Sequence, residues 1–198
     1  PADATVDTLY LHINIWTDDI FRVVFSKEKK ISNPFSGLPE NARMLIAKPE
    51  KVEFTLDETE NKITLTTSKT EITVDKKTTR ISAKFIDGKE FYSQKKQDFR
   101  TGDIHDLALA DSDNDYACFE ALELESDEII YGLGERFDSL TRNGRTVDFH
   151  NKDAVGTTSR RAYINIPFYL STKGYGLFLN SGAKTDWQIA TTDLSALQ

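Results

Sequence analysis

The spacing of its apolar residues constrains this chain more than any other feature of its sequence. From Thr8 to Phe85, apolar side chains mostly recur at every second position, which places them on one face of a β-strand. Polar clusters that favour turns, at 57–61 and 75–77, separate these runs at the intervals typical of an all-β sandwich. We therefore expect an all-β sandwich with no helix longer than about three turns. The alternating sets are Leu9, Leu11, Ile13 and Ile15; Val52, Phe54 and Leu56; Ile63 and Leu65; Ile72 and Val74; and Ile81, Ala83 and Phe85.

Two dipeptides mark tight turns. Asp87-Gly88 and Asn143-Gly144 are pairs that readily adopt the positive φ of a two-residue hairpin turn, and both are flanked by strand-like sequence. The polar stretch from Gln94 to Asp115 shows no clear period, so we expect a long surface connection there with at most one short strand. In the second half of the chain, strands are expected at 119–124, 129–133, 162–170, 175–180 and 186–190.

Charge and cysteine usage exclude several classes of protein. The 198 residues include 25 Lys and Arg against 32 Asp and Glu, a net charge of −7, and the basic residues are scattered, so neither nucleic acid nor a membrane is expected as a partner. No apolar run approaches the length of a membrane span, and Pro1 to Ala4 lack the basic start of a signal peptide. We interpret the single cysteine, Cys118, as a core thiol, which fits a reducing, cytoplasmic location.

Motifs that suggest an independent active site are all incomplete. Gly132-Leu133-Gly134 is followed by Phe137 where a dinucleotide-binding fingerprint needs a third glycine, so we expect a bulge or a close backbone approach there. The acidic run Asp111–Asp115 lacks the glycine and glutamate of a calcium-binding loop. The three histidines are far apart and give no zinc-ligand spacing. We therefore expect no cofactor and no metal site.

An ordered series of short motifs in the second half of the chain is more specific. The motifs are Tyr131 to Phe137, Asn143-Gly144-Arg145-Thr146-Val147, Asn151-Lys152-Asp153, Tyr163 to Ser171, and Lys173 to Gly176. This series resembles the end of the N-terminal domain of glycoside hydrolase family 31, the α-glucosidases and α-xylosidases, and leans towards the bacterial α-xylosidase branch. His150 departs from the series, because relatives often have tryptophan there, and Ala154-Val155 replaces a glycine-rich continuation.

This resemblance implies a galactose-mutarotase-like β-sandwich that packs beside a catalytic (β/α)8 barrel. The whole chain, 1–198, would be one such domain, with 183–198 leading toward a barrel that this sequence does not contain. The two carboxylates of a retaining mechanism would lie in the barrel, so the domain alone would be non-catalytic. The expected partners are that barrel and an α-linked xyloside or glucoside oligosaccharide, with an oligomer possible in the full-length enzyme.

The resemblance also implies a substrate-binding role for the loop from Phe149 to Arg161. Asp153 is the main candidate, because a carboxylate accepts strong hydrogen bonds from two sugar hydroxyls at once. His150 and Lys152 flank it and could line the same subsite. Glu135 and Arg136 are interpreted as structural, since charges drawn into a sandwich must be paired.

Other functions remain open at this stage. An α-glucosidase N-terminal domain is the nearest alternative. A stand-alone carbohydrate-binding module would need an exposed aromatic platform, whereas Trp16 and Trp187, the only tryptophans, both lie in strand-like runs and are expected in the core. An aldose epimerase would need a histidine and a carboxylate that converge on one sugar, and no such grouping is visible. A purely structural domain would differ only in that Asp153 does not touch substrate.

Overall fold

The computed structural model describes residues 10–26, 29–30, 49–101, 116–151, 162–181 and 184–198. These residues contain strands and no helix, as the alternating pattern predicts. None of them forms a helix long and apolar enough to cross a membrane. The strands are β1 (Tyr10–Ile15), β2 (Phe21–Ser26), β3 (Thr55–Glu58), β4 (Lys62–Thr66), β5 (Thr70–Asp75), β6 (Ile81–Phe85), β7 (Glu90–Thr101), β8 (Tyr116–Glu123), β9 (Ile130–Gly132), β10 (Arg145–Phe149), β11 (Phe168–Ser171), β12 (Gly176–Phe178), β13 (Thr185–Ile189) and β14 (Ala196–Leu197).

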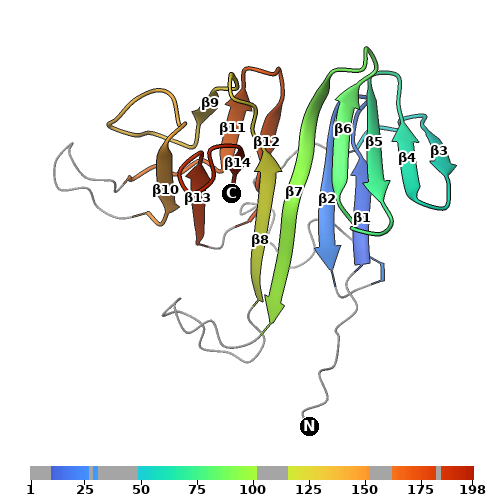
Figure 1. Cartoon of the computed structure of the whole chain (residues 1–198), viewed down its shortest axis with the longest axis horizontal. Coiled ribbons are helices and arrows are strands. Elements are labelled where there is room, and N and C mark those ends of the chain that lie inside the picture. Colours follow the sequence, from blue (N-terminus) through green and yellow to red (C-terminus); the bar gives the residue numbers. More distant parts are fainter. Residues whose placement is uncertain (1–9, 27–28, 31–48, 102–115, 152–161, 182–183) are drawn as a thin grey trace, which may run out of the picture.

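One large antiparallel sheet organises the domain. Its nine strands follow the order β10-β13-β14-β8-β7-β6-β5-β4-β3, so β10 and β3 lie at opposite edges and at opposite ends of the long axis of the molecule (Figure 1). A two-stranded sheet, β1-β2, and a three-stranded sheet, β12-β11-β9, complete the described fold. Because β10 is an edge strand, the residues that follow Phe149 leave the sheet at its rim.

The two smaller sheets pack against the large one and close the core. Phe21 of β2 meets Tyr92 of β7 edge-to-face at 6.0 Å between ring centroids, and Tyr169 of β11 meets Trp187 of β13 in the same way at 6.1 Å. Trp16 and Trp187 are both buried, as expected. The chain is therefore an all-β sandwich. Its buried core residues are Leu65, Ile72, Val74, Ile81, Ala83, Phe91, Tyr92, Leu122, Leu124, Ile130, Leu133, Val147, Tyr169, Trp187, Ile189 and Leu197.

The expectation of a long surface connection from Gln94 is wrong for its first part. β7 continues to Thr101 and pairs with β8 along most of its length, whereas 102–115 lie outside the described residues. The register shifts between Gln94 and Lys96, which breaks the period of two. Gln94 is also buried, with its amide oxygen accepting from Ile81 N at 2.8 Å, so a polar side chain occupies a core position. Both effects interrupt the alternation of apolar residues, so the sequence pattern does not indicate this strand.

The two glycine dipeptides form turns, but neither forms a two-residue hairpin. At Asp87-Gly88, Phe85 N donates to Lys89 O and Gly88 N to Phe85 O, so three residues with Gly88 at φ 93° join β6 and β7. At Asn143-Gly144, the following strand pairs with β13 instead of doubling back. The reason is the Asn143 side chain, which accepts from Ile130 N at 2.9 Å and donates to Glu128 O at 2.8 Å, in place of a strand partner.

The strand expected at 162–170 is present only at its end, because β11 begins at Phe168. Pro167 has no N–H to donate to a sheet ladder, which limits regular pairing just before β11. The strand expected at 129–133 is observed as β9, and those at 119–124, 175–180 and 186–190 as β8, β12 and β13. The two-residue β14, which bridges β13 and β8, had no apolar run long enough to predict it.

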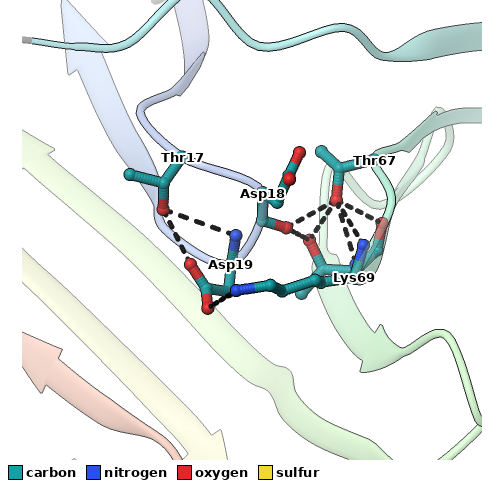
Figure 2. A network of polar contacts seen from close by, with 6 residues as sticks. Thr17, Asp18, Asp19, Thr67 and Lys69 are labelled. Carbon is teal, nitrogen blue, oxygen red and sulfur yellow. Dashed lines mark hydrogen bonds and ion pairs between the residues drawn. The ribbon is translucent and has the colours of Figure 1, made fainter.

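A polar network joins the β1–β2 hairpin to the large sheet (Figure 2). The backbone oxygen of Asp18, in the turn between β1 and β2, accepts from the Thr67 hydroxyl at 2.5 Å. Lys69 Nζ donates to Asp19 Oδ2 at 2.7 Å, and the Thr17 hydroxyl donates to Asp19 Oδ1 at 2.8 Å. The hydrogen bond from Lys69, followed by that from Thr17, lowers the pKa of Asp19. Two turns about fifty residues apart are thereby fixed side by side.

Candidate functional site

The Gly132-Leu133-Gly134 motif is a point of close backbone packing, as the sequence predicts. Its three residues have positive φ angles of 109°, 62° and 87°. A Cβ at Gly132 would lie 2.7 Å from the carbonyl oxygen of Phe168, and one at Gly134 would lie 2.8 Å from the backbone nitrogen of Ile166 and closer still to the oxygen of Ile164. Leu133 is fully buried. The motif therefore fixes one backbone segment against another.

Arg136 follows this motif and joins three parts of the chain. Its Nη2 donates to Asn165 Oδ1, its Nε donates to Leu133 O at 3.3 Å, and its guanidinium lies over the ring of Phe149 at 5.6 Å. Burial, and then the nearby charge of Arg142, lowers the pKa of Arg136, which stays far above neutrality as for any arginine. The prediction that Arg136 is structural agrees with these contacts.

Asn165 connects Arg136 to the start of the candidate loop. Its Nδ2 donates to Asn151 Oδ1 at 2.5 Å, so Arg136, Asn165 and Asn151 form a continuous hydrogen-bonded chain. Phe149, the last residue of β10, lies two positions before Asn151 and packs on Trp187 at 5.7 Å. The stem of the loop is thus fixed by an aromatic contact and a polar chain. Sequence reasoning missed Asn165, although it is a lone amide in a run of apolar residues.

The predicted substrate-binding residues fall at and beyond this stem. His150 is exposed and directly follows β10. Lys152 and Asp153 lie outside the described residues, so the position of the main candidate stays a prediction. Glu135 is exposed, and its backbone nitrogen donates to Ile164 O at 3.0 Å.

A second polar cluster behind the stem is buried and structural. The side chain of Arg142 is only 5% exposed and donates from Nη1 to Asp138 Oδ1 at 2.6 Å and from Nε to Gly132 O at 2.7 Å. Deeper in the domain, the carboxylate of Glu128 is 1% exposed and accepts from the hydroxyl of Ser171. Desolvation raises the pKa of Tyr175, which lies beside Glu128. Because each charge has a partner, these groups hold the sandwich together.

The described contacts position the start of the loop. Within 10–26, 49–101, 116–151 and the other described stretches, no three His, Cys, Asp or Glu side chains gather in a group that could hold a metal ion. Near the stem, Glu135, Asp148 and Asp186 are exposed, and Asp148 lies directly opposite Asp186 in the register of β10 and β13. What the described site can do is hold the first residues of a loop in a fixed place.

The fold defines a class of domain, the antiparallel β-sandwich. A sequence model described as the glycosyl hydrolase 31 N-terminal galactose mutarotase-like domain matches residues 10–187. The chain belongs to that family of domains.

Named relatives are consistent with this assignment. The chain is 44% identical over 79 residues to the α-xylosidase XylQ of Lactiplantibacillus pentosus, which covers 40% of the chain and 10% of that protein. It is 47% identical over 68 residues to an α-xylosidase of Emericella nidulans, covering 34% of the chain and 9% of that protein. The fold matches a Flavobacterium johnsoniae dextranase of glycoside hydrolase family 31, solved with isomaltotriose, with a TM-score of 0.77 at 19% identity over 97% of the chain and 22% of that structure.

Proposed function

We propose that this chain is the N-terminal domain of a retaining α-glycosidase of the α-xylosidase type, which packs on the catalytic barrel and supplies the loop after β10 to the substrate site. The observation that carries the proposal is the fixed stem of that loop, formed by Arg136, Asn165 and Asn151. The high local identity to two proteins named α-xylosidases supports the choice of substrate class. The alternative within the family is an α-glucosidase.

The division of labour follows from the chemistry of a retaining glycosidase. Such an enzyme needs one carboxylate to attack the anomeric carbon and a second, about 5 Å away, to protonate the leaving oxygen and later activate water. The family resemblance implies that the barrel, and not this domain, supplies that pair. The proposed contribution of the domain is therefore binding and orientation of an α-linked oligosaccharide, while both catalytic carboxylates belong to the barrel.

Within this division, Asp153 is the proposed substrate contact. Asn151 is held by Asn165, and Asp153 follows it by two residues in the sequence. Its carboxylate would accept hydrogen bonds from two sugar hydroxyls, and a hydrogen bond to a charged group contributes about 1.5–3 kcal/mol. His150 and Lys152 are secondary candidates for the same subsite.

The test is the exchange of Asp153 for alanine in the full-length enzyme. Losing one charge-assisted hydrogen bond should lower kcat/KM for aryl α-xyloside by roughly ten- to a hundredfold. The free energy of unfolding should change by no more than about 0.5 kcal/mol, as for a surface residue. Asp57→Ala is the matched control, since Asp57 is an exposed aspartate on β3, at the opposite edge of the sheet.

The two variants separate substrate binding from general effects of removing a surface charge. We expect Asp57→Ala to keep the kcat/KM of the unmodified enzyme. If Asp153→Ala also keeps it on every α-glycoside tried, the loop does not bind substrate and the domain is scaffold alone.

A further inference from the structure

One run of the chain is free of charge over an unusual length. The eleven residues from Ala162 to Thr172 include no Asp, Glu, Lys or Arg, although 29% of all residues are charged. Within this run, apolar side chains at every second position are exposed instead of buried. We call these, together with a cross-strand neighbour, the apolar stripe: Ile164, Ile166, Phe168, Leu170 and Tyr131, each between 38% and 53% exposed.

The pairing of β11 explains why part of the stripe forms one continuous face. Phe168 and Leu170 alternate with Tyr169 and Ser171, which are buried, so the first two point away from the sandwich core. Tyr131 of β9 lies directly opposite Leu170 in the antiparallel register and shares its face.

A glycine completes this face on the other side of β11. Gly176 of β12 is the second cross-strand partner of Leu170. A Cβ at Gly176 would lie 2.7 Å from the tip of the Phe168 ring, so the absence of a side chain makes room for that ring beside β12.

Such a face is costly when it meets water. A sheet with one solvated side normally places polar residues on that side, and contiguous exposed apolar patches mark contact surfaces. Here the outward positions of β11 carry Phe168 and Leu170, so the solvent side of this strand is apolar. We therefore expect a partner to cover the outer face.

We propose that the apolar stripe is the surface that packs against the catalytic barrel, an inference that rests on the proposed function. The proposal rests on the hydrogen bond between this segment and the stem of the loop. Asn165 lies between Ile164 and Ile166 and binds Asn151, at the start of the loop proposed to reach the substrate. A loop can reach the barrel mouth only if the segment bound to its stem lies on the barrel side of the domain.

The relatives contain much polypeptide outside the matched region, which would be large enough to cover the stripe. The matched region is 22% of the Flavobacterium johnsoniae dextranase and 10% of the Lactiplantibacillus pentosus α-xylosidase, so most of each relative is other polypeptide. A bound sugar is disfavoured because it could stack only on Tyr131 and Phe168, whereas the other three residues of the stripe are aliphatic. A second copy of the chain is disfavoured because it would compete with the barrel for the loop side.

The first experiment maps side-chain exposure in the unmodified full-length enzyme by hydroxyl-radical footprinting. Leu170 and Leu56 form a matched pair, since both are strand leucines, 53% and 60% exposed in this domain. We expect oxidation of the peptide with Phe168 and Leu170 to be at least about fivefold slower than that of the peptide with Leu56, because covering a side chain removes it from water. Equal oxidation overturns the proposal. Protection that is lost when dimers dissociate on dilution, or that appears only with added oligosaccharide, assigns the stripe to a second copy or to sugar and overturns it too.

The second experiment places a charge in the stripe. Leu170→Asp in the full-length enzyme should lower kcat/KM about ten- to a hundredfold by displacing the loop from the substrate site, whereas Leu56→Asp should stay within about twofold. If both variants retain full activity, the stripe is not the barrel contact although the enzyme is a glycosidase. If the unmodified full-length protein hydrolyses no α-glycoside while the stripe is protected, the proposed function fails and the contact surface stands.

Discussion

Replacing Gly134 by alanine perturbs the point at which two backbone segments approach most closely. Gly134 has φ 87°, a region that costs a residue with a Cβ about 1–2 kcal/mol. The added Cβ would also lie 2.8 Å from Ile166 N and closer to Ile164 O, and neither backbone atom can rotate away. Moving Ile164 would weaken the hydrogen bond from Glu135 N, worth about 0.5–1.5 kcal/mol. We therefore expect Gly134→Ala to lower the free energy of unfolding by about 3 kcal/mol or more.

Gly88→Ala is the matched control for this prediction. Gly88 has φ 93°, but a Cβ there would meet nothing within 4 Å, so only the conformational cost of about 1–2 kcal/mol applies. In thermal unfolding of the 198-residue chain, with about 2–4 °C for each kcal/mol, we expect Gly88→Ala to lower Tm by about 2–8 °C and Gly134→Ala by clearly more. Equal shifts, or a larger one for Gly88→Ala, would refute the account of close packing at the motif.

Two further predictions concern charged groups. The pKa of Asp193 is held at about 2 by hydrogen bonds from Lys95 Nζ and from Ser195, below the usual 3.9 or so, so its stabilising effect is present above about pH 4 and is lost as the pH falls towards 2. Asp193→Asn should remove that part of the acid-induced fall in Tm, and an unchanged profile of Tm between pH 4 and 2 would contradict it. Glu128→Ala should lower the free energy of unfolding in urea by about 1–3 kcal/mol, because it leaves the buried Ser171 hydroxyl without its acceptor, whereas Lys173 keeps its ion pair with Glu125. A loss below about 1 kcal/mol would show that Glu128 is not needed there.

The fold class followed from the sequence because strand residues that face a single core alternate in polarity. The runs at 63–65, 72–74 and 81–85 lie in β4, β5 and β6. The alternation of apolar residues gave wrong predictions at two places where a polar side chain replaces a regular strand feature. Gln94 places a polar side chain in the core next to a register shift, and the side chain of Asn143 replaces a strand at the turn where a hairpin was expected.

The candidate site was predictable in part. The motif series located the loop after β10, and the structure adds that Asn165 ties its stem to Arg136. That link joins residues far apart in the chain, and no local spacing indicates it. The sequence also did not predict that Ile164 and Leu170 are exposed. Apolar residues at every second position give the same pattern whether they face the core or a partner.

The central claim is that this domain serves a glycosidase whose chemistry lies elsewhere. The most direct measurement compares the full-length protein with the 198-residue chain on aryl α-xyloside and aryl α-glucoside. The account predicts turnover with retention of anomeric configuration by the full-length enzyme and none by the chain alone. Turnover by the 198-residue chain that survives repurification and is removed by mutating one of its own residues would contradict it.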